Sequence, residues 1–158
     1  MKLRFRFPWA VLAGFGVMAG CSDAFDSGEE RELEQARTRW NGAGFQDYRV
    51  EVRLGCFCQA ALQDFSRLTV QAGQVVAVDP LTPTPGAEDI PLDAWPTVPE
   101  VFELIESASR QSEYTEVEAQ YDPILGYPTR LQLRCEADVL DCGALYELQN
   151  LSPVAGGS

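Results

Sequence analysis

The chain has 158 residues, enough for one domain with a hydrophobic core, and 24 acidic against 12 basic residues give it a formal net charge of −12. A field of this sign repels nucleic acid and anionic head groups, so the composition argues against DNA or RNA partners. The chain has no histidine, which excludes Ser-His-Asp and Cys-His mechanisms and any metal site that needs imidazole.

The first 20 residues have the organisation of a secretory signal peptide. Three basic residues precede an apolar run at 9–19, and small residues come before Cys21. This run is too short for a transmembrane helix, which needs about 20 residues. Met18-Ala19-Gly20-Cys21 resembles a bacterial lipobox, whose cysteine is lipidated and becomes the new N-terminus, with Met18 where leucine is usual. We therefore predict a signal peptide at 1–20 and a lipid anchor on Cys21.

The predicted anchor gives an expected location. A lipid on Cys21 places the protein in the bacterial cell envelope, attached to the membrane and facing the periplasm. Ser22 follows Cys21, whereas Asp at that position is the usual inner-membrane retention signal in enteric bacteria. We therefore expect the outer membrane in a Gram-negative host. The membrane is the first expected partner, and an envelope protein is the second.

The first half of the mature chain begins with a polar tether at 21–28. Leu33, Ala36 and Trp40 fall on one helical face, and strict alternation buries Tyr48 and every second residue after it. A tight turn joins the second and third strands. In order, we expect a helix at 29–40, strands at 48–54, 65–72 and 75–78, and an irregular loop with five prolines at 79–96.

The second half opens with a helix-start signal. Thr97 and Glu100 form a capping box, and apolar residues then recur at helical spacing up to Ala108. Strands are expected at 114–121, 129–135 and 142–151. This order predicts one α+β domain over 29–152, with a mostly antiparallel sheet of about six strands, two helices packed on one face and a flexible tail at 153–158. The other face would be wet and carry Arg49, Glu51, Arg53, Arg130, Gln132 and Arg134.

Several of these segments together resemble a bacterial family of secreted or lipid-anchored domains of unknown function. The segments are Cys56-Phe57-Cys58, the hairpin at 72–78, the helix start at 96–106, the turn Tyr121-Asp122-Pro123-Ile124-Leu125-Gly126-Tyr127-Pro128 and the strand at 146–151. The resemblance covers most of the mature chain. It implies an exported α+β domain and brings no catalytic residues with it.

Four cysteines remain besides Cys21, and an even number in an exported chain favours disulfides. Cys135 and Cys142 lie at the two ends of a hairpin loop, where a cross-strand bond fits. Cys56 and Cys58 are a harder pair, because residues two apart on an extended strand lie about 6.5–7 Å apart at Cα. Either Gly55 lets the chain kink, or these cysteines pair with Cys135 and Cys142 across the sheet. The sequence leaves this connectivity open.

Two functional interpretations of the cysteines compete with structural disulfides. A redox-active dithiol would usually be Cys-x-x-Cys at a helix start, whereas Cys56 and Cys58 have one residue between them and lie on a strand. A four-thiolate zinc site does not suit an oxidising compartment. We therefore expect structural disulfides and no metal.

Two other clusters have simpler structural explanations. Tyr121 to Pro128 groups aromatic and acidic residues as a ligand site would, but Asp-Pro followed by Gly is also what a strand connection needs. Glu136, Asp138 and Asp141 lack the regular spacing of a calcium loop and are expected at a solvated hairpin tip.

The resulting functional hypothesis is a lipid-anchored, non-enzymatic envelope domain without a cofactor. It would bind or scaffold a partner through its sheet face or its proline loop. The alternative is a periplasmic thiol–disulfide protein that uses Cys56 and Cys58. A hydrolase relying on carboxylates alone ranks third, because no spaced pair of acids singles itself out.

Overall fold

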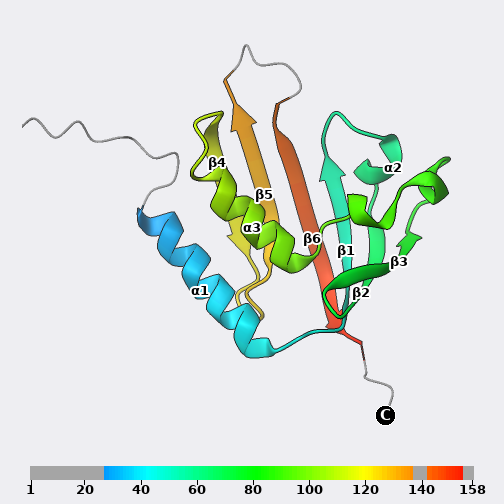
Figure 1. The fold of residues 1–158 in the computed structure, drawn as a ribbon, viewed down its shortest axis with the longest axis horizontal. Helices are drawn as coiled ribbons and strands as arrows, with labels where there is room; N and C mark the ends of the chain where they lie inside the picture. Colours follow the sequence, from blue (N-terminus) through cyan, green and yellow to red (C-terminus); the bar gives the residue numbers. More distant parts are fainter. Residues whose placement is uncertain (1–26, 137–141, 155–158) are drawn as a thin grey trace, which may run out of the picture.

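The fold is known from a computed structural model that describes residues 27–136 and 142–154. It is α+β, as predicted, with one six-stranded antiparallel sheet (Figure 1). The helices are α1 (Ser27–Ala43), α2 (Ala60–Gln63) and α3 (Val98–Ala108), with 3-10 turns η1 (Ala87–Asp89) and η2 (Leu92–Ala94). The strands are β1 (Tyr48–Gly55), β2 (Ser66–Gln71), β3 (Gln74–Pro80), β4 (Tyr114–Tyr121), β5 (Pro128–Cys135) and β6 (Ala144–Pro153).

The sheet has the order β3-β2-β1-β6-β5-β4. The last strand, β6, therefore lies between β1 and β5 (Figure 1). Its pairing with β1 joins the group β1–β2–β3 to the group β4–β5–β6 in one sheet. Both edges are formed by inner parts of the sequence, β3 and β4. None of the described helices is long and apolar enough to cross a membrane.

Local sequence signals account for most element boundaries. The β2–β3 turn has positive φ at both Ala72 (49°) and Gly73 (77°), as a tight hairpin with the right-handed twist of its strands requires. At the start of α3, Thr97 Oγ1 accepts from the Glu100 N–H, and the Glu100 carboxylate accepts from the Thr97 N–H at 2.7 Å. The predicted capping box is thus confirmed.

The hydrophobic core follows the predicted alternation. Tyr48, Val50 and Val52 are at most 2% exposed, and Leu131 and Leu133 are buried beside them in the same core. Tyr48 also makes a polar contact there, because its hydroxyl accepts a hydrogen bond from the Val98 N–H at 3.0 Å. Burial raises the pKa of Tyr48 to about 12. This contact ties the start of β1 to the first turn of α3.

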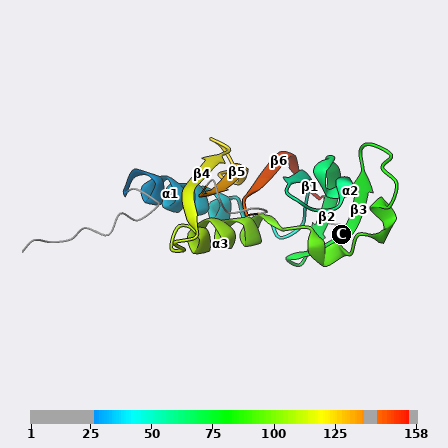
Figure 2. The same cartoon turned by 90° about the horizontal axis from the view of Figure 1, so that it is seen from above.

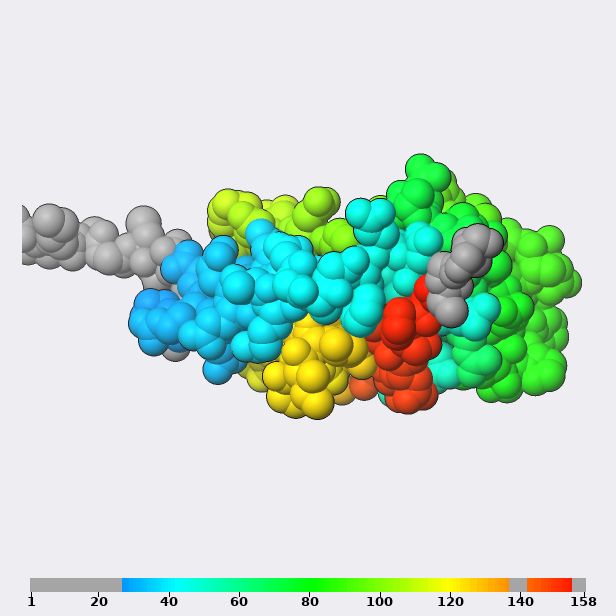
Figure 3. All heavy atoms as spheres, turned by 90° about the horizontal axis from the view of Figure 1, so that it is seen from below, coloured from blue at the N-terminus to red at the C-terminus, as the bar shows by residue number. Residues whose placement is uncertain are grey.

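Helix α3 packs on β5 and β4. Helix α1 lies beside it at the same end of the molecule (Figures 1 and 2). Arg37 on α1 forms an ion pair with Glu106 on α3 at 3.0 Å and donates to the Phe102 carbonyl. The turn between β4 and β5, yellow in Figure 3, lies against α1. Gly126 in this turn has φ 80°, and a Cβ there would lie 2.8 Å from the Arg39 Cβ. Only glycine permits this approach.

The opposite face of the sheet carries the predicted charged residues, and most of them are paired. Glu147 accepts from Arg53 and from Arg130, and Arg134 forms ion pairs with Glu116 and Glu118. We call this surface the polar face. The polar face is exposed to solvent at its margins. It also holds one buried charged side chain, Glu51, which is only 6% exposed. The alternating sequence pattern of β1 did not predict this burial. Arg67, Gln149 and Asn150 all donate to the Glu51 carboxylate, and the Arg67 bond is the main cause of its lowered pKa.

The structure also differs from expectation at several element ends. Helix α1 begins at Ser27 instead of 29, and β6 begins at Ala144 and reaches Pro153. Val154 then donates its N–H to the Asp47 carbonyl at 3.0 Å, which ties down part of the expected tail. The short helix α2 was not predicted, because four residues are too few for a periodic pattern.

Candidate functional site

The two disulfide bonds pair neighbours in the sequence. Cys135 bonds to Cys142 with a Cα–Cα distance of 5.9 Å, as expected for a hairpin loop. Cys56 bonds to Cys58 with a Cα–Cα distance of 5.2 Å. That separation is shorter than an extended strand allows, so the chain bends directly after β1 and the cross-sheet pairing is not formed. Cys21 lies outside the described residues.

The Cys56–Cys58 ring presents an aromatic side chain to solvent. Phe57, between the two cysteines, is 90% exposed. The Gln63 side-chain amide of α2 donates to the carbonyls of Cys56 and Cys58 at 3.4 and 3.5 Å, which braces the ring from one side. The ring is therefore an exposed loop at the end of β1, closed by its disulfide.

The segment from Tyr121 to Pro128 is a strand connection. The Asp122 carboxylate accepts from the N–H groups of Ile124 and Leu125 at 2.9 and 2.7 Å, the pattern of an Asx turn. Tyr121 stacks on Phe102 of α3 with ring centroids 6.2 Å apart. These residues hold the turn and helices together, as the turn interpretation predicts.

The predicted hairpin tip lies only partly within the described residues. Glu136 is exposed, while Asp138 and Asp141 lie outside the described residues. Within residues 27–136 and 142–154, no three His, Cys, Asp or Glu side chains gather as metal ligands would.

A cavity lies between β3 and the proline loop. Its volume is about 490 Å³, and it is lined by Val78, Pro80, Pro83, Thr84, Pro85, Ala87 and Glu88. The loop wall is held in place, because Thr84 donates to the Asp64 carboxylate at 2.6 Å and Ile90 is buried in the core. Backbone hydrogen bonds in the turns at 84–90 add to this. The cavity therefore has a built wall, and we call it the β3 cavity.

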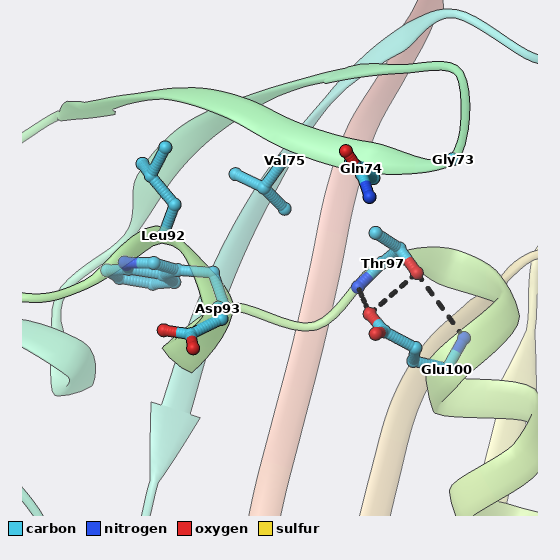
Figure 4. A pocket seen from close by; sticks show the side chains of 8 residues that line it. Gly73, Gln74, Val75, Leu92, Asp93, Thr97 and Glu100 are labelled. Carbon is cyan, nitrogen blue, oxygen red and sulfur yellow. Dashed lines mark hydrogen bonds between the residues drawn. The ribbon is translucent and has the colours of Figure 1, made fainter.

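A second cavity of about 320 Å³ borders the other end of β3 (Figure 4). It lies between Gln74 and Val75 of β3, η2, and the first turn of α3. Its most prominent acid, Glu100, is already engaged by Thr97, as the dashed lines in Figure 4 show. Trp95, also in its lining, is 3% exposed and its indole N–H has no hydrogen-bond partner within the described part of the chain.

The surface around β3 has a distinct chemical character. Of the five exposed large apolar side chains in the described residues, three lie on β3 or in the loop after it, namely Val76, Leu81 and Leu92. Between Leu68 and Ser109 the chain has seven acidic residues and no Lys or Arg. Four of these acids, Asp79, Glu88, Asp89 and Asp93, make no side-chain hydrogen bond or ion pair with other described residues. The region is apolar with an unpaired acidic rim.

This region lies far from the point where the described chain begins. Ser27, at the start of α1, is at one end of the molecule, and β3 with the proline loop is at the opposite end (Figures 1 and 2). The long axis of the protein separates the two.

The fold and this site define a small, disulfide-bonded α+β domain with a recessed surface beside one sheet edge. A family model for a family of unknown function (DUF6174) matches residues 32–153, and the chain belongs to that family. The predicted resemblance to an uncharacterised domain family is confirmed. No curated protein and no solved structure shows significant similarity to the chain.

Sequence reasoning identified the disulfide cysteines and the proline loop but not the β3 cavity. The cavity exists because β3 is a sheet edge, and strand order cannot be read from local patterns. One available signal was the long stretch from Leu68 to Ser109 without a basic residue, which marks a surface of uniform charge.

Proposed function

We propose that this protein is a lipid-anchored binding domain of the bacterial cell envelope, which presents β3 and the proline loop to a partner. The observation that carries the proposal is the built, apolar β3 cavity with the unpaired Glu88 in its lining, at the end of the molecule opposite Ser27. A lipid on Cys21 would hold the α1 end near the membrane, so the β3 end would point away from it. That arrangement leaves the binding surface accessible.

The polar face is the weaker candidate for binding. Its arginines are paired with carboxylates of neighbouring strands, such as Arg130 with Glu147 at 2.9 Å. A partner that used these groups would first have to break existing ion pairs. The acids near β3 have no such partners, so a ligand can engage them without that cost.

The anchor is tested by Cys21→Ser in the full-length precursor. We expect the variant to leave the membrane fraction, because the acyl chains supply most of the attachment at about 0.8 kcal/mol per buried CH₂. In a Gram-negative host, wild type should co-sediment with outer-membrane markers in a sucrose gradient. Retention of Cys21→Ser on the membrane would contradict the anchor.

The binding surface is tested by photo-crosslinking in intact cells. A photoreactive amino acid replaces Leu81 or Leu92, both about two-fifths exposed, or Ile124 as a control at the distant β4–β5 turn, which is 80% exposed. We expect a discrete adduct from the first two positions and none from Ile124. Equal adducts from all three positions would mean that the β3 end has no special role.

A second candidate function is thiol–disulfide exchange, with the exposed Cys56–Cys58 ring as its site. This function requires that the Cys56–Cys58 bond is readily reduced. Its reduction potential decides the matter, since structural disulfides lie below about −300 mV. The Cys135–Cys142 bond of the same protein serves as the internal reference. A markedly higher potential for Cys56–Cys58 would move this candidate to first place.

A further inference from the structure

We propose that the outer edge of β3 binds an extended, basic polypeptide segment of a partner by strand addition, with one apolar side chain of that segment in the β3 cavity. The inference rests on the proposed function, because it names the chemistry of the partner for the same surface. Strand addition gains affinity from main-chain hydrogen bonds and specificity from pockets for alternate side chains. Each of these components has a counterpart at β3.

The first component is a free set of backbone groups. Strand β3 pairs only with β2, and no hydrogen bond from the described residues reaches its outer edge. The Leu81 N–H donates to the Phe65 carbonyl, which fixes the alternation along this ladder. Ala77 and Asp79 therefore turn their peptide groups toward β2, and Val78 turns its N–H and carbonyl outward. Pro80, also outward, offers only its carbonyl.

The second component is an edge that is uncharged along its first five residues. Sheet edges are commonly guarded by charged side chains, and the opposite edge, β4, carries Glu116 and Glu118. Strand β3 has no charged residue from Gln74 to Val78, and three of those five residues are valines. Such a segment favours strand pairing over solvent exposure.

The third component is a side-chain pocket in the right place. Val78 and Pro80 belong to the same edge and line the β3 cavity. A strand added beside them would direct every second side chain to that side of the sheet. The volume of about 490 Å³ accommodates a large apolar side chain, and the prolines of the loop keep the opposite wall preformed.

Charge decides the nature of the segment. Glu88 lines the cavity, and Asp89 and Asp93 lie close by in the sequence with no basic residue among them. Asp79 contributes less to this field, because the strand register places it opposite Arg67 of β2. A segment with Lys or Arg would gain from this field, and an acidic one would be repelled.

A second copy of this chain is a poor occupant by the same reasoning. Each copy brings the same acidic rim and a strongly negative net charge. The register shift between Thr69 and Val70, together with Pro80, also shortens the regular part of the edge. A short peptide fits this edge better than a long self-paired strand does.

The experiment uses the mature domain and two sets of fluorescent six-residue peptides. In both sets every second residue is Val or Leu. The residues between them are Lys or Arg in the basic set and Glu in the acidic set. We expect anisotropy titrations to show binding of the basic set, weakened by salt, and at least ten-fold weaker binding of the acidic set. Saturation should slow amide exchange at Val78 at least ten-fold, measured by NMR.

Three variants locate the interaction. Val78→Pro removes the outward N–H without touching the β2 ladder and should weaken binding at least ten-fold. Ala87→Phe fills the cavity and should do the same. Glu88→Gln should weaken binding about three-fold at low salt, whereas Glu34→Gln, a matched exposed acid on α1, should leave it unchanged.

Other outcomes overturn the proposal. Unchanged binding by folded Val78→Pro or Ala87→Phe, equal binding of acidic peptides, or no binding of any peptide at millimolar concentration would each exclude strand addition. A concentration-dependent dimer that Val78→Pro abolishes would identify a second copy as the occupant. If crosslinks from Leu81 and Leu92 persist in any of these cases, the proposed function stands and only the mode of binding is wrong.

Discussion

The two ends of the sheet are covered in different ways. At the β4–β5 end, helices α1 and α3 pack closely, with Phe102 stacked on Tyr121 and the Arg37 guanidinium 5.6 Å from the centroid of the Phe102 ring. At the β2–β3 end, the cover is the proline loop with two short 3-10 turns. Recesses occur at both ends, with volumes of about 320 and 490 Å³ beside β3 and about 320 and 100 Å³ between α1 and α3.

This difference suggests that the two ends of the sheet have different roles, one in stability and the other in recognition. A helix presents a continuous apolar stripe that fills the space above a sheet, and α3 does so with Val101, Phe102 and Ile105. A loop stiffened by prolines spans the same distance with few buried side chains, and within 79–96 only Ile90 and Trp95 are buried. We infer that the helical end supplies most of the folding free energy and the loop end is available for binding.

The largest expected effect comes from one glycine at each end. Gly126→Ala forces a Cβ against Arg39 and α1 at φ 80°, and we expect a loss of about 2–4 kcal/mol in unfolding free energy. Gly86→Ala is the matched control in the proline loop, with φ 82° and no atom within 4 Å, and should cost only about 1 kcal/mol. Urea denaturation measures both. Equal losses would contradict the difference in packing.

Removal of each disulfide gives the next effect. Cys135→Ala with Cys142→Ala should lower the unfolding free energy by roughly 2–3 kcal/mol, because that bond closes the longer loop. The same double change at Cys56 and Cys58 should cost roughly 1–2 kcal/mol, since only one residue lies between them. Thermal unfolding of the two variants, with mass spectrometry to confirm the bonds in wild type, tests this order. Four free thiols in exported protein would refute both structural assignments.

Tyr48 joins the two ends and should make the protein sensitive to alkali. Its pKa is raised from 10.0 to about 12, so the folded state favours the neutral phenol. The associated stability is fully present below pH 10 and is lost as the pH rises toward 12, by about 2 kcal/mol. Denaturation followed between pH 9 and 12 should show this decline, and Tyr48→Phe should make it shallower. The rest of the decline comes from the other four tyrosines, whose pKa values burial also raises. A Tyr48→Phe curve that falls as steeply as wild type would assign the decline to other groups.

The smallest effect is expected in the loop itself. Thr84→Ala removes the hydrogen bond to Asp64 and should reduce global stability by only about 0.5–1.5 kcal/mol. Amide exchange at 82–90 should nevertheless accelerate clearly, because this bond holds the wall of the β3 cavity. Thr115→Ala on β4, which removes a weaker 3.3 Å bond to the Arg134 carbonyl of β5, is the control and should leave loop exchange unchanged. Unchanged loop exchange in Thr84→Ala would mean that the prolines alone fix the wall.

Local interactions explain what the sequence by itself determined. The α3 start follows from Thr97 and Glu100, which lie three residues apart, and the β1 face follows from simple alternation after Tyr48. The Cys135–Cys142 bond spans one hairpin loop, so it too was foreseeable. In each case the partners are neighbours in the chain, and residue type and spacing are enough to specify their geometry.

Long-range contacts decided the rest. Strand β6 pairs with β1 and β5, so β3 stays an edge with β2 as its only neighbour, and the β3 cavity lies beside that edge. Glu51 falls on the polar side of β1 yet is buried, because Arg67 and Asn150 from two other strands surround its carboxylate. The bend after Gly55 chose the Cys56–Cys58 pairing over the cross-sheet alternative. Each outcome depends on which distant strands meet, and local propensity carries no information on that.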